Sequence, residues 1–431
     1  MTRALPALAL ALVLAIDCTR PATANASRFL PSASAIRRAI PVTAWKAPNT
    51  PESQLFQYNF SNSPDGAEPT GDLIYVNGAI YGTTSTGGYD AGWGGNGTVF
   101  RLPINGKHES VLYSFKGGPD GAAPFGGLIY VNGTFYGSTN QGGGSPACSN
   151  GCGTVFALSP TGQETVLYRF RGGSDGALPL GNLLFANGAL YGTTIGGGIY
   201  GPNCLAEGCG TIYRVSLNGS ETVLHRFQGT TDGAGPAAGL INVNGTFYGT
   251  TYGTPTGLTS TIFTVTPSGV ERVIYHFGDW AWQTIPKTGA IPTASLTYLN
   301  GLLYGTTTMG GLYDNGCVYS VAPNGVEHVV YSFTGKSDGA NPQSDLIVLN
   351  GMLYGTAQMG GIKAAGTEFG VVFEVSPSGG ERVVHAFDGP NGAQPIGGVL
   401  LVDGHLFGTT YQGGPPACGG PGCGTLFAVA P

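Results

Sequence analysis

The chain has 431 residues, of which 76 are glycine and 29 are proline, and a formal net charge of −6 at pH 7. Only 10% of the residues are charged, and this sparse, mildly acidic composition argues against a nucleic-acid partner. The glycines do not recur at every third position, which excludes a collagen-like fibre. They lie at fixed offsets between apolar runs, which indicates turns.

Residues 1–26 have the features of a secretory signal peptide, in which Arg3 precedes the apolar run Leu5–Ile16 and small residues provide a cleavage site near Ala26. The apolar run is too short to span a bilayer, and no later stretch is long enough. Lipidation at Cys18 is the less favoured alternative, because the preceding aspartate fits a lipoprotein signal poorly. We therefore expect a secreted or periplasmic protein without a membrane span.

Residues 27–53 show no periodicity, and we interpret them as a linker that Trp45 could hold against the following domain. From Leu55 to Pro431 the sequence is repetitive. An apolar residue, an aromatic-glycine pair and two small residues recur seven times, with the aromatic residue at Tyr81, Tyr136, Tyr191, Tyr248, Tyr304, Tyr354 and Phe407. Spacings between successive copies are 55, 55, 57, 56, 50 and 53 residues, a period typical of propellers and solenoid arrays.

Each repeat contains four short apolar segments, here called strands A to D, which in the first complete repeat are Leu73–Val76, Ala79–Thr84, Thr98–Leu102 and Val111–Phe115. The pair Asn77-Gly78 joins A to B and predicts a type I′ hairpin turn. A second tight turn joins C to D. This pattern predicts an all-β, seven-bladed β-propeller with four antiparallel strands per blade. A β-helix has much shorter coils, and a β-sandwich does not need seven near-copies of one unit.

The strands at the two ends of the repetitive region complement each other. A lone D strand, Leu55–Phe60, precedes the first A strand, and the last repeat ends after its C strand, Thr425–Val429. We expect them to pair, so that the N-terminal strand completes the last blade, closes the ring and removes two exposed edges. The predicted domain is residues 54–431. Its A–B and C–D turns share one face, the tight-turn face, and its longer B–C and D–A loops share the other, the long-loop face.

Six cysteines lie in close pairs just before a C strand. The pairs are Cys148 with Cys152, Cys204 with Cys209, and Cys418 with Cys423. Zinc binding is the alternative to disulfides, but the pairs belong to different repeats and lack partner histidines. Three disulfides are favoured in an exported protein. Cys317 stands where other repeats have threonine, and we expect it to be a buried, apolar residue.

The D–A loops share an Asp-Gly-Ala-x-Pro element. Its first position holds Asp65, Asp120, Asp175, Asp232, Thr288, Asp338 and Asn391. A ring of carboxylates could bind a cation, but an Asp-Gly turn in which the carboxylate caps its own backbone is favoured, because Asn and Thr can replace Asp in that role. His225 and His385 replace the tyrosine of the D strand, which indicates a shared hydrogen bond at a half-buried site. No catalytic motif or phosphate loop is recognisable, so the sequence predicts no catalytic residue, metal or cofactor.

Three tryptophans are the candidate ligand-binding residues. Trp93 lies in the first B–C loop, and Trp280 and Trp282 lie in the fifth D–A loop, which is longer than its counterparts. Exposed indoles can stack on sugar rings; the alternative is that they pack the long loop onto its neighbour.

The recurring pattern L-x-x-x-x-G-x-L-Y-G-T-T, followed by G-T-V-F, V-L-Y-x-F and D-G-A-x-P, resembles the GloVer (Gloeo/Verruco) tandem repeat of exported, choice-of-anchor bacterial proteins. The likeness covers roughly residues 55–431. It implies export and a repetitive β fold and supplies no enzymatic activity. Because the chain ends on a strand and not on an anchoring segment, we expect a soluble exported product.

The sequence thus favours an exported, monomeric binding or interaction module with a carbohydrate or protein ligand on the long-loop face. Two alternatives stay open at this point. One is an extracellular hydrolase or lyase whose site lies over the central channel, and the other is a purely structural envelope protein.

Overall fold

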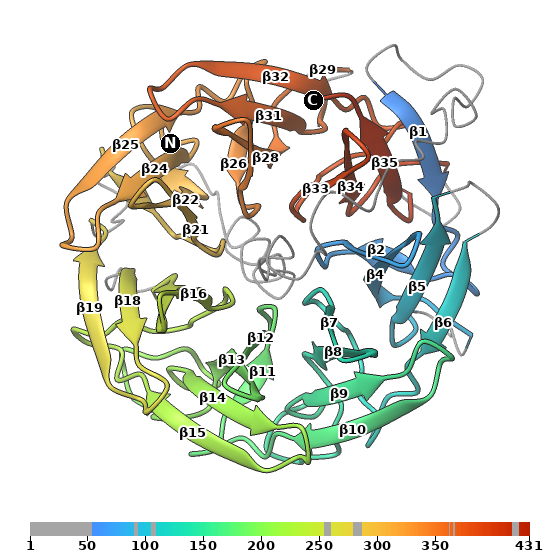
Figure 1. The fold of residues 1–431 in the computed structure, drawn as a ribbon, viewed down its shortest axis with the longest axis vertical. Coiled ribbons are helices and arrows are strands. Elements are labelled where there is room, and N and C mark those ends of the chain that lie inside the picture. The colour runs from blue at the N-terminus through green and yellow to red at the C-terminus, as the bar shows by residue number, and fades with distance from the viewer. Residues whose placement is uncertain are drawn as a thin grey trace, which may run out of the picture.

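The computed structural model describes residues 54–89, 94–104, 109–253, 260–278, 287–361, 363–364, 367–415 and 422–431. The predicted signal peptide and linker, residues 1–26 and 27–53, lie outside these ranges. Figure 1 shows seven small sheets arranged in a ring around a central axis. The described residues form strands and no helix, and so include no helix that could cross a membrane. The prediction of an all-β, seven-bladed β-propeller is confirmed.

Each blade is an antiparallel meander whose A strand lies nearest the axis and whose D strand lies at the rim (Figure 1). The A strands of blades 1 to 7 are β3 (Ile74–Val76), β7 (Ile129–Val131), β12 (Leu184–Ala186), β16 (Ile241–Val243), β21 (Thr297–Leu299), β27 (Ile347–Leu349) and β33 (Leu400–Val402). The B strands are β4 (Ala79–Thr86), β8 (Thr134–Thr139), β13 (Ala189–Gly196), β17 (Thr246–Thr251), β22 (Leu302–Thr307), β28 (Met352–Met359) and β34 (His405–Thr410).

The outer half of each blade follows the same order. The C strands are β5 (Thr98–Pro103), β9 (Thr154–Leu158), β14 (Thr211–Ser216), β18 (Thr261–Val265), β24 (Cys317–Val321), β31 (Val371–Val375) and β35 (Thr425–Val429). The D strands are β6 (Ser110–Ser114), β10 (Glu164–Arg169), β15 (Glu221–Arg226), β19 (Glu271–His276), β25 (Glu327–Ser332), β32 (Glu381–Ala386) and β1 (Gln54–Asn59). Short loop strands complete the set: β2 (Ala67–Pro69), β11 (Ala177–Pro179), β20 (Gly289–Ala290), β23 (Met309–Gly310), β26 (Ala340–Pro342), β29 (Lys363–Ala364) and β30 (Thr367–Glu368).

Blade 7 is built from both ends of the described chain (Figure 1). Its strand order is β1-β35-β34-β33, with β1 antiparallel to β35. The register places Tyr58 opposite Leu426 and Asn59 opposite Thr425. Every C–D pair contains a register shift, for example between Val99 and Phe100 in blade 1. Such bulges bend a strand, and the D strands follow the circumference of the ring (Figure 1).

The core lies between blades, where one aromatic contact recurs seven times. The phenylalanine after each D strand packs edge-on against the aromatic residue of the next blade's C strand, with ring centroids 4.9–5.2 Å apart. In the first copy Phe60 packs on Phe100, which lies over Gly82 of its own blade. A Cβ at Gly82 would be 2.5 Å from Phe100 Cζ. The Tyr-Gly signature therefore needs glycine because an aromatic ring occupies the space of a side chain.

A second recurring pair joins the B and C strands. In five blades two buried threonine hydroxyls lie 2.8 Å apart, as in Thr84 with Thr98. In blade 5 the second partner is Cys317, whose Sγ lies 3.2 Å from Thr307 Oγ1. Cys317 is fully buried and has a free thiol, as predicted.

Candidate functional site on the long-loop face

The D–A loops are fixed by their own short strands and by the preceding blade. In blade 3, β11 pairs with the end of β13, placing Pro179 opposite Thr194. Between alanine and proline, Leu178 has φ of 60°, a left-handed conformation uncommon for residues other than glycine. Its N–H donates to the carbonyl of Cys152 in blade 2 at 2.9 Å. This hydrogen bond holds the loop in place and ties neighbouring blades together.

The aspartates of the Asp-Gly-Ala-x-Pro element cap their own turns, as predicted. Asp120 Oδ2 accepts the N–H of Lys116 at 2.8 Å, and Asp120 Oδ1 accepts the hydroxyl of Tyr113 at 2.7 Å. The same Tyr-to-Asp hydrogen bond recurs in three other copies. No group of three or more acidic, histidine or cysteine side chains in the described part of the chain could hold a metal.

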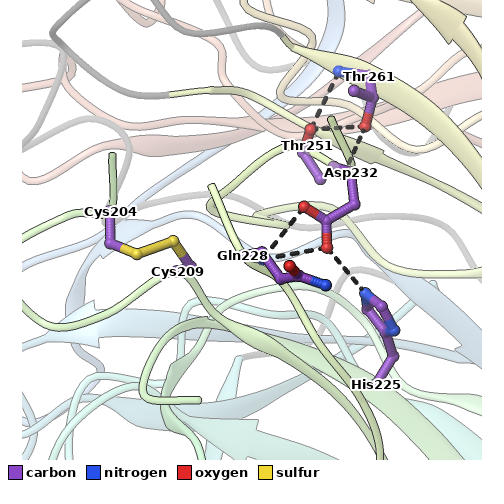
Figure 2. Close-up of polar contacts among 7 residues, drawn as sticks. All are labelled: Cys204, Cys209, His225, Gln228, Asp232, Thr251 and Thr261. Atoms are coloured by element: carbon purple, nitrogen blue, oxygen red, sulfur yellow. Dashed lines mark hydrogen bonds and ion pairs between the residues drawn. A yellow bond between two sulfur atoms is a disulfide. The ribbon is translucent and has the colours of Figure 1, made fainter. Parts of the chain in front are cut away.

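Histidine takes the place of tyrosine in two copies and keeps the contact. His225 Nε2 lies 3.2 Å from Asp232 Oδ2, which also accepts the N–H of Gln228 (Figure 2). His385 Nε2 lies 3.4 Å from Asn391 Nδ2. The predicted shared partner of the D-strand Tyr or His is therefore the loop Asp or Asn. Burial lowers the pKa of His385 to about 4, against the opposing charge of Asp388.

The glutamates at or just before the start of the D strands were not singled out from the sequence. Glu109 Oε2 lies 3.5 Å from the hydroxyl of Tyr58, which belongs to the preceding blade. Burial and then the charge of Asp65 raise the pKa of Glu109 to about 8. A signal was present, since glutamate occupies this position in six repeats and Gln54 in the other.

At the inner end of the long-loop face, buried side chains contact one another. On one side they form an apolar cluster that includes Phe125, Leu180, Ile195 and Tyr252. Equivalent positions in blades 5 and 6 are polar and paired.

Nearer the axis, Asp72 accepts the N–H of Gly398 at 2.7 Å and an N–H of Asn182 at 3.1 Å. Asp345 likewise accepts the N–H of Ser295 at 2.7 Å. These groups connect blades around the axis.

Exposed aromatic side chains on this face lie in B–C loops. Tyr89, Tyr200 and Tyr313, from blades 1, 3 and 5, are 69%, 54% and 53% exposed. Each follows closely after two glycines with positive φ, such as Gly87 and Gly88 at 78° and 103°. The backbone at Tyr89 is anchored, because the Tyr89 N–H donates to Ser114 Oγ of the D strand at 3.0 Å.

Two of the three predicted disulfides are confirmed. Cys148 is bonded to Cys152 and Cys204 to Cys209, the latter beside the Asp232 turn in Figure 2. Cys423 is also disulfide-bonded, whereas its predicted partner Cys418 lies outside the described residues.

The candidate ligand-binding tryptophans, Trp93, Trp280 and Trp282, lie outside the described residues. Their role in ligand binding stays a prediction.

Several solved structures are similar to this chain. A putative 6-phosphogluconolactonase from Bacteroides uniformis gives a TM-score of 0.47 at 14% identity, over 76% of this chain and 87% of that chain. A gluconolactonase from Xanthomonas campestris gives 0.38 at 15% identity, over 64% and 78%. A puromycin hydrolase gives 0.48 at 13% identity, over 81% and 50%.

No curated protein matches the chain. The family described as the Gloeobacter/Verrucomicrobia repeat matches it four times, over residues 46–205, 89–291, 147–369 and 281–431. These overlapping matches span all seven blades and agree with the resemblance seen in the repeated sequence pattern. The chain belongs to the Gloeobacter/Verrucomicrobia repeat family.

Proposed function

We propose that this protein is an exported binding module that takes an extended carbohydrate on its long-loop face. The observation that supports this most is the exposure of Tyr89, Tyr200 and Tyr313 in equivalent loops of alternate blades. An aromatic ring on a fixed loop loses little conformational entropy on binding and offers an apolar face to a sugar ring. Three such rings spaced around the propeller suit a polymer that contacts several blades, because linked weak contacts add through effective concentration.

Export rests on separate support. The Cys148–Cys152 and Cys204–Cys209 disulfides fit an oxidising compartment, and residues 1–26 have the pattern of a signal peptide. We expect the exported protein to begin after Ala26. Mass spectrometry of the protein recovered from the periplasm or medium measures this directly, and a mass that includes residues 1–26 would contradict export by this route.

A glycan array followed by a turnover assay on the hits tests the binding module. Binding without product formation is expected, and product formation would overturn the proposal in favour of a hydrolase or lyase. No binding to any glycan would contradict the carbohydrate ligand.

Substitutions locate the site. On a glycan hit, Tyr89→Ala, Tyr200→Ala and Tyr313→Ala should each weaken binding about tenfold, equivalent to ~1.4 kcal/mol, and leave the melting temperature unchanged. Tyr298→Ala is the matched control, because Tyr298 is also exposed, at 38%, but lies in an A strand. Equal losses in the control and the loop variants would remove the B–C loops from the site.

The paired substitution Trp280→Ala and Trp282→Ala tests the longer loop. If these indoles stack on the ligand, the double variant should lose binding and keep its melting temperature. Loss of stability with intact binding would show that they pack the loop instead. Tryptophan emission that shifts to shorter wavelength on adding the glycan would support stacking.

A further inference from the structure

A set of three interacting side chains recurs where successive blades meet, and it is here called the junction triad. It consists of the D-strand Tyr or His of one blade, the Asp of the following D–A loop, and the Glu at the start of the next blade's D strand. The five complete triads are Tyr58–Asp65–Glu109, Tyr113–Asp120–Glu164, Tyr168–Asp175–Glu221, His225–Asp232–Glu271 and Tyr331–Asp338–Glu381.

The hydroxyl of Tyr58 lies between the two carboxyl groups of the first triad. The Tyr58 hydroxyl donates its single proton to Asp65 Oδ2, which is 2.6 Å away. Glu109 Oε2 lies 3.5 Å from the same hydroxyl oxygen, which then has only lone pairs to offer. Because the hydroxyl proton lies with the nearer Asp65 oxygen, a charged Glu109 gains little from this long contact.

The other oxygen of each glutamate is buried. Oε1 has no hydrogen-bond partner within the described chain in any of the five: Glu109, Glu164, Glu221, Glu271 and Glu381. Leaving a charged oxygen there would lose its hydration without compensation, whereas a neutral acid loses much less. Burial therefore favours the protonated form of each glutamate.

In the Tyr331–Asp338–Glu381 triad, the aspartate keeps the negative charge. Asp338 accepts hydrogen bonds from the hydroxyl of Tyr331 at 2.8 Å and from the N–H of Thr334 at 2.7 Å. Although burial acts in the opposite direction, the hydrogen bonds from Thr334 and Tyr331 lower the pKa of Asp338. Two neighbouring acids in such different surroundings divide their roles, one ionised and the other protonated.

The pKa values of the glutamates agree with this division. Burial, with the charge of the triad aspartate next, raises the pKa from 4.5 to about 8 for Glu109 and to about 7 for Glu164, Glu221 and Glu381. At Glu271 burial again dominates and gives a pKa of about 7, with Asp232 raising it and His225 lowering it.

Cations and hydroxyls that face the glutamates act against the shift and do not abolish it. They are Arg169 and Lys116 at Glu164, Arg226, Arg171 and Tyr168 at Glu221, Tyr58 at Glu109, and Tyr331 at Glu381.

The two remaining junctions lack a full triad. In one, Gln54 takes the place of the glutamate, because it pairs with Val429 as Glu381 pairs with Val375. Asn391 takes the place of the aspartate at the same junction. Both carboxyl groups are thus replaced by amides at the same junction. In the other, Thr288 replaces the aspartate while Glu327 is kept. Within this chain, five of the six junction glutamates face a loop aspartate, and the junction that lacks the glutamate also lacks the aspartate.

We propose that each of the five complete junction triads is a proton-binding site shared by two blades, and that loss of these protons weakens the packing between neighbouring blades. When the glutamate ionises, its buried charge lacks a hydrogen-bond donor from the described residues at Oε1 and faces a second carboxylate across the blade junction. Because folding raises the pKa of these glutamates, their protonation stabilises the folded chain. This stabilisation is fully present below the unfolded value near 4.5 and is lost as pH rises through about 7 to 8.

Thermal melts of the exported chain between pH 5 and pH 9 test the proposal. The melting temperature of the wild type should fall as pH rises from 5 to about 8 and change little above that. A triple variant, Glu164→Gln, Glu221→Gln and Glu381→Gln, introduces the amide that the chain already uses at position 54 and should remove about half of this fall. Glu207→Gln, in a B–C loop away from the triads, is the matched control and should keep the wild-type slope.

Infrared spectroscopy of the wild type gives a second readout that does not depend on a variant folding. At pH 6 the protein should show the C=O stretch of buried carboxylic acids, and this band should disappear by pH 9. The proposal is overturned if the triple variant keeps the full wild-type slope. It is equally overturned if the wild type shows no protonated carboxyl band at pH 6.

Discussion

At the scale of single residues, the repeats show which polar side chains depend on one another. Where blade 5 replaces one buried threonine by Cys317, the sulfur still lies 3.2 Å from Thr307. Blade 6 loses both hydroxyls together, with Ala357 opposite Val371. Leaving one buried hydroxyl without a partner would lower the free energy of unfolding by about 1–3 kcal/mol. The pair is therefore kept, exchanged or removed as a unit.

His385 gives a residue-scale prediction about acid. Because burial lowers its pKa from 6.5 to about 4, the unfolded chain binds this proton first, and stability present above pH 6.5 is lost as pH falls toward 4. The loss should approach about 3 kcal/mol. His385→Gln should flatten the free energy of unfolding over this pH range, measured by urea titration. His405→Gln, at a partly exposed histidine, is the control, and an equal effect there would contradict the assignment.

At the scale of elements, the short disulfides close loops that carry the long-loop face. Each closes only four or five residues of separation, so the loop-entropy model assigns each about 2 kcal/mol. The paired change Cys148→Ser and Cys152→Ser should lower the free energy of unfolding by that amount without changing the blade count. Thiol titration of the denatured exported protein should find one free group, Cys317. Three or more free thiols would contradict the disulfide assignment.

The strands and turns were predictable because local signals repeat. Asn77 and Gly78 have φ of 48° and 82°, as the type I′ turn requires, and seven copies of one pattern leave little choice of architecture. The loop aspartates were interpretable for the same reason, since Asp-Gly turns are local. The partnership of Glu109 with Tyr58 was not, because it joins residues that are 51 positions apart and belong to different blades. The exposure of Tyr89 also required the folded loop.

At the scale of the whole molecule, stability depends on contacts between neighbours around a ring. Each blade packs on the next through one aromatic pair, such as Phe387 with Phe427 at 5.0 Å, and through a D–A loop. Blade 7 has its outer strand, β1, from the beginning of the repetitive region. An open ring would expose the edge of β35 and the apolar faces of two blades, which invites pairing with other chains.

The closed seven-bladed ring is tested most directly by deleting residues 54–60 and measuring thermal unfolding and size-exclusion profile. The matched control begins at Gln54 and so lacks everything before the strand while keeping β1 intact. We predict that the control melts as the exported protein does and stays monomeric, whereas the deletion melts many degrees lower and associates through the exposed edge of β35. A deletion variant with an unchanged melt and an unchanged monomer peak would contradict the closed ring.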